Sequence, residues 1–85
     1  MSVELLEPNG ADGRAPGRVA SLFSPRETDC LALLVKGYTD EEIAAELEIS
    51  HATVRFHLGG ARQKIRARSR THLAALAVAM GAARP

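Results

Sequence analysis

The sequence predicts an all-α fold, a four-helix, bundle-like domain that contains a helix-turn-helix. Three observations support this prediction. Serine or threonine stands at each of four places where a helix is expected to begin, and apolar residues follow at helical spacing. No segment alternates between apolar and polar residues for long enough to form a strand. The 85 residues allow one small domain, which we expect over residues 23–85.

Residues 1–22 are expected to form a flexible N-terminal tail or linker, because residues 8–18 are rich in glycine and proline. The first helix then begins with Ser24-Pro25-Arg26-Glu27, in which Ser24 is the N-cap and Glu27 completes a capping box. Gly37 is expected to end it. Its buried stripe should be Leu31, Leu34, Val35 and Tyr38, and the single cysteine, Cys30, should be a small core residue.

A second capping box, Thr39-Asp40-Glu41-Glu42, opens a short second helix, and Glu48-Ile49 forms the turn after it. Ser50 caps the third helix, which contains the pair Gly59-Gly60 as a weak point. Ser69 caps the fourth helix, and Gly81 ends it. The short second helix, the tight turn and the third helix predict a helix-turn-helix.

The charges are segregated along the chain, although the formal net charge is only +1. Residues 25–48 hold seven acidic residues and two cations, whereas residues 49–85 hold seven cations and no acidic residue. A segment of this kind indicates a polyanionic partner, and its alternative is a solvated basic face. The basic residues are Arg55, Arg62, Lys64, Arg66, Arg68, Arg70 and Arg84.

The third helix separates into two faces at 100° per residue. Val54, Leu58, Ala61 and Ile65 are expected to face the core, and the opposite face holds no acidic residue. We therefore expect the segment 50–66 to lie in the major groove of double-stranded DNA. Arg55 is the best candidate for a bidentate contact to guanine, and Phe56 for a thymine methyl group; the alternative for Phe56 is packing against the N-terminal tail. Phosphate contacts are expected from Thr53, Arg62, Lys64 and Arg66.

Taken together, these residues resemble the LuxR/GerE-type helix-turn-helix, from about Phe23 to Gly81, and are most similar to its quorum-sensing branch. The matching pieces are Ser24-Pro25-Arg26-Glu27, Gly37-Tyr38-Thr39, Glu42-Ile43-Ala44, Leu47, Ile49-Ser50, Thr53-Val54, Phe56-His57, Lys64-Ile65 and Arg70-Thr71. The ordered set at this spacing is highly specific, although each piece alone is weak.

The resemblance implies a four-helix domain that pairs through its last helix and binds inverted-repeat DNA. It also implies base contacts at the positions of Ala52, Arg55, Phe56 and Gly59. Two residues depart from the family: Gly59 stands where a Lys or Arg is frequent, and Glu48 where glycine is frequent. Either the helix backbone approaches the DNA closely at Gly59, or the DNA-binding face is partly lost.

The fourth helix has more apolar surface than one buried stripe needs, so we expect a homodimer through it. Its stripe is either core or dimer surface, and a helix in so small a domain can serve both. The residues expected at the interface are His72, Leu73, Leu76, Ala77 and Met80.

The function expected is that of a sequence-specific transcriptional regulator. The alternative is a truncated interaction protein that forms a heterodimer with a full-length LuxR-type regulator and inhibits it. Met1 and the chain length favour a stand-alone protein, whereas the linker-like residues 8–18 favour an output domain of a longer one.

Other classes of function find no support in the residues. His51, His57 and His72 lack the i, i+4 spacing of a helical metal site, so neither a metal nor another cofactor is expected. No nucleophile is paired with a base, and no loop is built to hold phosphate, so the protein is not expected to be an enzyme. A single cysteine and the absence of a long apolar run predict a cytoplasmic protein without a membrane span.

Overall fold

The computed structural model of the protein describes residues 22–85, so the predicted tail lies outside the described residues except for Leu22. The described part contains four α-helices and no strand. They are α2 (Pro25–Leu34), α3 (Asp40–Leu47), α4 (His51–Lys64) and α5 (Arg70–Ala79). The predicted all-α, four-helix domain is therefore confirmed. None of these helices is long and apolar enough to cross a membrane.

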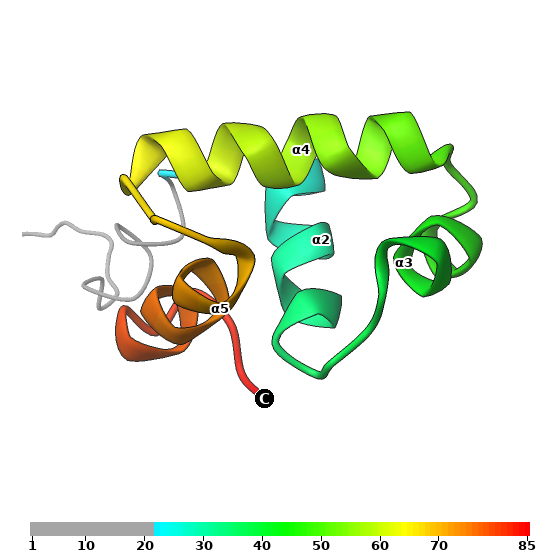
Figure 1. Ribbon diagram of the computed structural model, residues 1–85. Helices are drawn as coiled ribbons and strands as arrows, with labels where there is room; N and C mark the ends of the chain where they lie inside the picture. The colour runs from blue at the N-terminus through cyan, green and yellow to red at the C-terminus, as the bar shows by residue number, and fades with distance from the viewer. Residues whose placement is uncertain (1–21) are drawn as a thin grey trace, which may run out of the picture.

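The longest helix, α4, lies across the other three (Figure 1). In this view α2 crosses below the middle of α4, α3 lies near its N-terminal end, and α5 lies near its C-terminal end. This arrangement leaves one long side of α4 uncovered by any other helix in the described part of the chain.

All four predicted N-caps are present. The hydroxyl oxygens of Ser24, Thr39, Ser50 and Ser69 each accept the backbone N–H three residues further on, at 3.0 to 3.1 Å. Such a cap contributes about 1 kcal/mol to stability relative to alanine. The first two caps are completed by glutamates that reach back to the cap backbone, as the capping-box motifs predict.

Each helix contributes a fully buried apolar side chain to one core: Leu31, Ile43, Val54 and Leu73 are all at most 1% exposed. Cys30 is buried among them, which confirms its predicted place in the core. Burial raises the pKa of its thiol, so the side chain stays protonated and packs as a small apolar group. The rest of the core is Phe23, Leu34, Ala44, Leu58, Ala61, Ala67 and Ala77.

Two predicted helices are shorter than expected. The first helix ends at Leu34 with Val35 as its C-cap, so Tyr38 lies in the following loop and is half-buried there. The segment 50–66 is helical only over His51–Lys64, because Arg66 adopts the left-handed conformation (φ 55°) and turns the chain away. Gly37 (φ 94°) and Gly81 (φ 76°), the two glycines expected to end helices, both adopt the left-handed conformation, and they lie shortly after the ends of α2 and α5.

Candidate nucleic-acid interface

The uncovered side of α4 is an exposed surface without acidic residues. Val54, Leu58 and Ala61 face the core, as predicted. The residues exposed on the opposite side are Ala52, Arg55, Phe56, Gly59 and Gln63. The side chain of Phe56 is 75% exposed. The described part of the chain therefore leaves a large apolar side chain in contact with water.

The turn that places this surface is tight. The left-handed conformation of Glu48 (φ 58°) ends α3, and the N–H of Ile49 donates to the carbonyl oxygen of Ala44 at 3.0 Å. Ser50 then begins α4 at once. The structure therefore confirms the helix-turn-helix and its turn at Glu48-Ile49. The left-handed conformation of Glu48 would cost less energy for a glycine, which has no Cβ atom.

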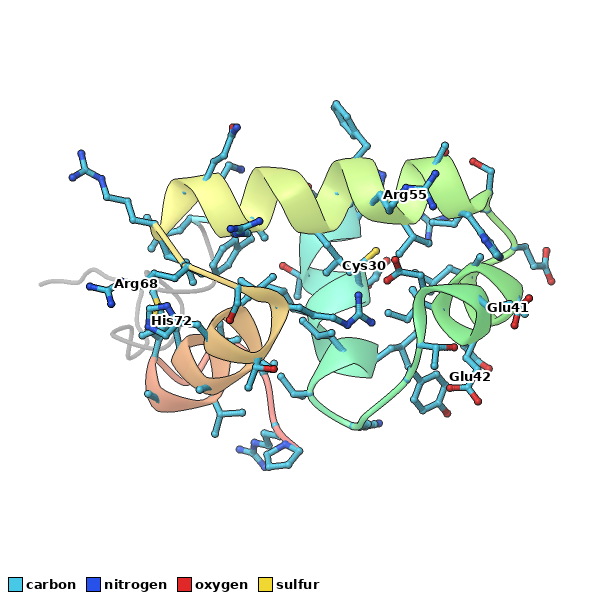
Figure 2. The ribbon with its side chains drawn as sticks, viewed as in Figure 1. Cys30, Glu41, Glu42, Arg55, Arg68 and His72 are labelled. Atoms are coloured by element: carbon cyan, nitrogen blue, oxygen red, sulfur yellow. The ribbon has the colours of Figure 1, made fainter. Side chains whose placement is uncertain are left out.

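The negative charge of α3 is divided between two sides of that helix. Figure 2 shows Glu42 on the side of α3 that faces away from α4. Asp40 and Glu41, by contrast, line a hollow together with His51 and Arg55 of α4. A polyanion that approaches α4 therefore meets little repulsion from Glu42, whereas Asp40 and Glu41 lie beside Arg55.

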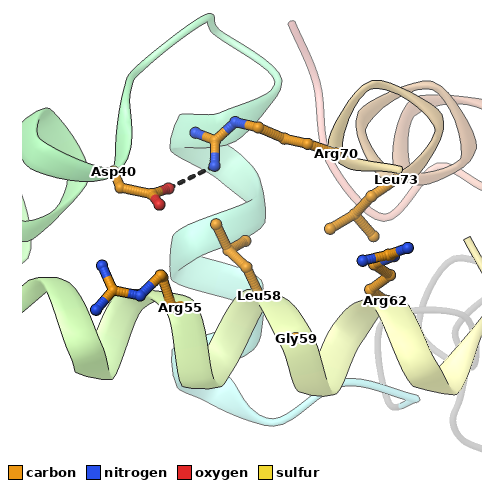
Figure 3. A pocket seen from close by; sticks show the side chains of 7 residues that line it. All are labelled: Asp40, Arg55, Leu58, Gly59, Arg62, Arg70 and Leu73. Atoms are coloured by element: carbon orange, nitrogen blue, oxygen red, sulfur yellow. Dashed lines mark hydrogen bonds and ion pairs between the residues drawn. The ribbon is translucent and has the colours of Figure 1, made fainter. Parts of the chain in front are cut away.

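Arg55 lies on α4 near Asp40, at the beginning of α3 (Figure 3). It forms no hydrogen bond or ion pair with the residues that the structure describes. Its neighbour Thr53 is half-buried at the first turn of α4, where its hydroxyl lies 2.8 Å from that of Ser50. Both side chains stand in the N-terminal half of α4, where the sequence predicts contacts with DNA.

Arg62, predicted to contact phosphate, has partners within the domain. Its Nε donates to the carbonyl oxygen of Ala67 at 2.9 Å and its Nη2 to that of Arg68 at 2.7 Å. The side chain thus closes the loop between α4 and α5. Sequence reasoning missed this role, because backbone acceptors in a loop leave no pattern of side chains.

Lys64, also predicted to contact phosphate, forms an ion pair with Glu27 of α2. Its Nζ lies 2.7 Å from Glu27 Oε1, and the backbone N–H of Ser24 donates to the same oxygen at 2.9 Å. Glu27 is only 8% exposed. Lys64 therefore ties the end of α4 to the beginning of α2, a second role that the sequence did not indicate.

The two adjacent glycines of α4 have different surroundings. A Cβ atom on Gly60 would lie 2.6 Å from Oε2 of Glu27, whereas a Cβ atom on Gly59 would meet nothing within 4 Å. The glycine at position 60 therefore makes room for the Glu27 carboxylate. At position 59 the described part of the fold leaves open space for a Cβ atom and does not require a glycine.

The candidate dimer residues on α5 differ in how deeply they are buried. Leu73 (1% exposed) and Ala77 (0% exposed) lie in the core, which is one of the two places that the sequence left open for this stripe. Leu76 and Met80 are half-buried, and Val78, 39% exposed, lies on the outer side with Ala75 and Ala79. His72 and Arg68 lie together at the beginning of α5 (Figure 2), where His72 Nδ1 accepts the backbone N–H of Arg68 at 2.9 Å.

The pKa of Glu27 lies below its ordinary value of 4.5. Burial alone would raise it, but the hydrogen bonds from Lys64 and Ser24 and the positive charge of Lys64 more than offset that effect. Because the folded state holds its proton less tightly than the unfolded state, ionised Glu27 stabilises the fold above pH 4.5. That contribution is lost as the pH falls below this value.

We expect the free energy of unfolding of the wild type to exceed that of Glu27→Gln at pH 7, and the difference to shrink below about pH 4.5. Urea unfolding from pH 7 to pH 3 measures it. In a Lys64→Met background the same substitution should have a smaller effect with a weaker pH dependence, since the principal hydrogen-bond donor is gone. A difference that stays constant across the whole pH range would contradict the role given to Glu27.

Comparison with known proteins adds to this geometry. Residues 21–77 match the family model described as "Bacterial regulatory proteins, luxR family". The chain is 44% identical over 63 residues to the quorum sensing-dependent transcriptional regulator VjbR of Brucella abortus, a match that covers 74% of this chain and 24% of VjbR. It is 40% identical over 60 residues to the spore germination protein GerE of Bacillus subtilis, covering 71% of this chain and 81% of GerE.

A third relative, the regulatory protein SdiA of Escherichia coli, is 42% identical over 59 residues. The match covers 69% of this chain and 25% of SdiA. The chain thus spans about a quarter of the length of VjbR and SdiA, but most of the length of GerE. These matches confirm the resemblance that the motifs of the sequence indicate.

Proposed function

The chain belongs to the LuxR family of bacterial regulatory proteins, and on this premise we propose that it is a sequence-specific, DNA-binding transcriptional regulator. The observation that supports this most is the uncovered, acid-free side of α4. A single α-helix fits the major groove of B-DNA, and a side chain that enters it meets base edges between two walls of phosphate. We expect the protein to act in the bacterial cytoplasm, where this DNA lies.

In the proposed complex the first half of α4 contacts the bases. Arg55 donates two hydrogen bonds to one guanine, and Phe56 packs on a thymine methyl group. Ala52 and Gly59 are small and exposed, so they let the helix backbone approach the base edges. The exposure of Phe56 supports this role, because DNA would cover an apolar surface that the described domain leaves open.

The phosphate contacts of the proposal come from Thr53, Arg62, Lys64 and Arg66. Arg66 is exposed just beyond the end of α4. Arg62 and Lys64 retain this role beside their internal one, since a guanidinium has five N–H donors and an ammonium three, and each uses only some of them within the domain. Contacts of this kind fix the position of the protein on DNA without selecting a sequence.

The proposal is tested by selecting preferred duplexes from a random pool and then measuring fluorescence anisotropy against a scrambled duplex. We expect tighter binding to the selected sequence and a steep salt dependence, with log K falling by roughly three units per tenfold salt for each protomer if Arg62, Lys64 and Arg66 neutralise phosphates. Equal, weak binding to both duplexes would contradict it. Such sequence-blind binding, together with tight association with a full-length LuxR-type regulator, would support the inhibitor instead.

We further propose that the regulator binds inverted-repeat DNA as a dimer through α5. The outer side of this helix supports the proposal, since Ala75, Val78 and Ala79 are exposed beside the half-buried Leu76 and Met80. Two protomers related by a two-fold axis would place two copies of α4 on successive turns of one DNA face. His72 lies at the beginning of the same helix.

Val78→Asp is expected to lower the dimer fraction by an order of magnitude, because the interface would bury a carboxylate without a partner. Sedimentation velocity at high micromolar concentration, with and without DNA, measures this. Ala45→Asp, which adds the same charge to an exposed position of α3, is the matched control and should leave the dimer unchanged. A wild type that stays monomeric under both conditions would refute the dimer.

A further inference from the structure

A hollow of about 230 Å³ lies where the beginning of α3, the middle of α4 and the beginning of α5 meet (Figure 3). It is basic: Arg55 and Arg62 of α4 and Arg70 of α5 line it, and Asp40 is the acidic residue on its wall. The proposed base-reading arginine thus shares one small space with a carboxylate. A carboxylate in that place competes with DNA for a guanidinium.

Arg70 forms an ion pair with the Asp40 carboxylate in the structure. Its Nη1 forms an ion pair with Asp40 Oδ1, and its Nη2 donates to the carbonyl oxygen of Tyr38 at 3.0 Å. The two residues are 30 positions apart in the sequence. The second hydrogen bond fixes the orientation of the guanidinium, so that Arg70 is held across the hollow against Asp40.

Arg55 lines the same hollow as this carboxylate. In Figure 3 Arg55 lies on α4 on the other side of Asp40 from Arg70, with its guanidinium extending along the helix, while the dashed line joins Asp40 to Arg70. Arg62, the third cation of the hollow, is held by the carbonyl oxygens of Ala67 and Arg68. If Arg70 were removed, Arg55 would therefore be the cation in the hollow that could pair with Asp40.

We propose that Arg70 is a positioning residue for DNA recognition, which neutralises Asp40 and so keeps Arg55 available for the bases. The inference rests on the proposed function. Its physical reason is competition: a half-buried carboxylate that loses its partner recovers the lost energy by pairing with the next cation. The state in which Arg55 binds Asp40 then rises in population, and DNA must displace that pair before Arg55 can read a base.

The test compares Arg70→Gln, Asp40→Asn and the double variant in the anisotropy assay. We expect Arg70→Gln to lower affinity for the selected duplex about tenfold, and to lower affinity for a scrambled duplex less. Asp40→Asn alone should retain or raise affinity, and the double variant should return to within about threefold of the wild type. Arg26→Gln, which breaks the exposed Arg26–Asp29 pair of α2 and changes the net charge equally, is the matched control and should have little effect.

A second comparison shows whether the effect passes through Arg55. In an Arg55→Ala background, Arg70→Gln should cost at most about twofold, because the side chain that it positions is absent. The same tenfold loss in both backgrounds would mean that Asp40 simply repels DNA, and would overturn the proposal. So would a loss that Asp40→Asn fails to rescue, which would mean that Arg70 itself contacts phosphate or supports the fold.

Thermal unfolding of every variant, followed by circular dichroism, separates loss of fold from loss of recognition. If the wild type itself shows no preference for any selected duplex, the proposed function fails. If the wild type binds specifically and the rescue is absent, only the role of Arg70 fails. The two failures are therefore distinguishable.

Discussion

Replacing Arg55 with alanine is expected to weaken binding to the preferred DNA sequence by about 1–3 kcal/mol and to relax the preference at one base pair. Arg55 is exposed on the uncovered side of α4 and has no partner among the residues that the structure describes. Its removal should therefore leave the stability of the fold unchanged. Competition anisotropy with duplexes that differ at single base pairs measures both effects.

Arg66→Ala is the matched control for this variant, since it removes one exposed arginine that is proposed to meet phosphate. It should weaken binding to every duplex about equally and make the salt dependence shallower by about one unit. If Arg55→Ala weakens all duplexes equally as well, Arg55 contacts phosphate and the proposed orientation of α4 in the groove is wrong.

Gly59→Ala and Gly60→Ala are expected to change stability in opposite directions, although the two residues are adjacent. Alanine in a helix interior is favoured over glycine by about 1 kcal/mol, and Gly59 has open space for the new methyl group. At Gly60 the methyl group would push the Glu27 carboxylate from its hydrogen bonds with Ser24 and Lys64. Losing a buried charge-assisted hydrogen bond costs about 1.5–3 kcal/mol, so this variant should be less stable than the wild type.

Urea unfolding of the two variants at neutral pH measures this difference, which we expect to be about 2 kcal/mol in the free energy of unfolding. In a Glu27→Ala background the two alanine variants should have similar stability, since the obstructing carboxylate is gone. Equal stabilities in the wild-type background would show that Glu27 moves aside without cost.

DNA binding by Gly59→Ala also decides between the two interpretations of this glycine. If the backbone of α4 approaches the bases there, as we propose, the methyl group lowers specific affinity in a protein that folds at least as well. Unchanged affinity would mean that this turn of the helix has lost contact with DNA.

The places where helices begin could be predicted from the sequence because a cap is a local structure. Ser24, Thr39, Ser50 and Ser69 each bond a backbone N–H only three residues away. The exposed and buried sides of α4 could be predicted for the same reason, since helical periodicity alone determines them. The ends of two helices were wrong: α2 ends at Leu34, ahead of the glycine at position 37, and α4 ends before Arg66, which adopts the left-handed conformation without being a glycine.

The sequence by itself thus determined the helices, the turn between α3 and α4, the family and the separation of charge along the chain. Only the tertiary structure decided which basic residues are free for a partner. Lys64 pairs with a glutamate 37 residues away, and Arg70 with an aspartate 30 residues away. Such pairs depend on how the helices cross, which no local pattern encodes. They leave Arg55 on the open side of α4, beside the Asp40 carboxylate that pairs with Arg70.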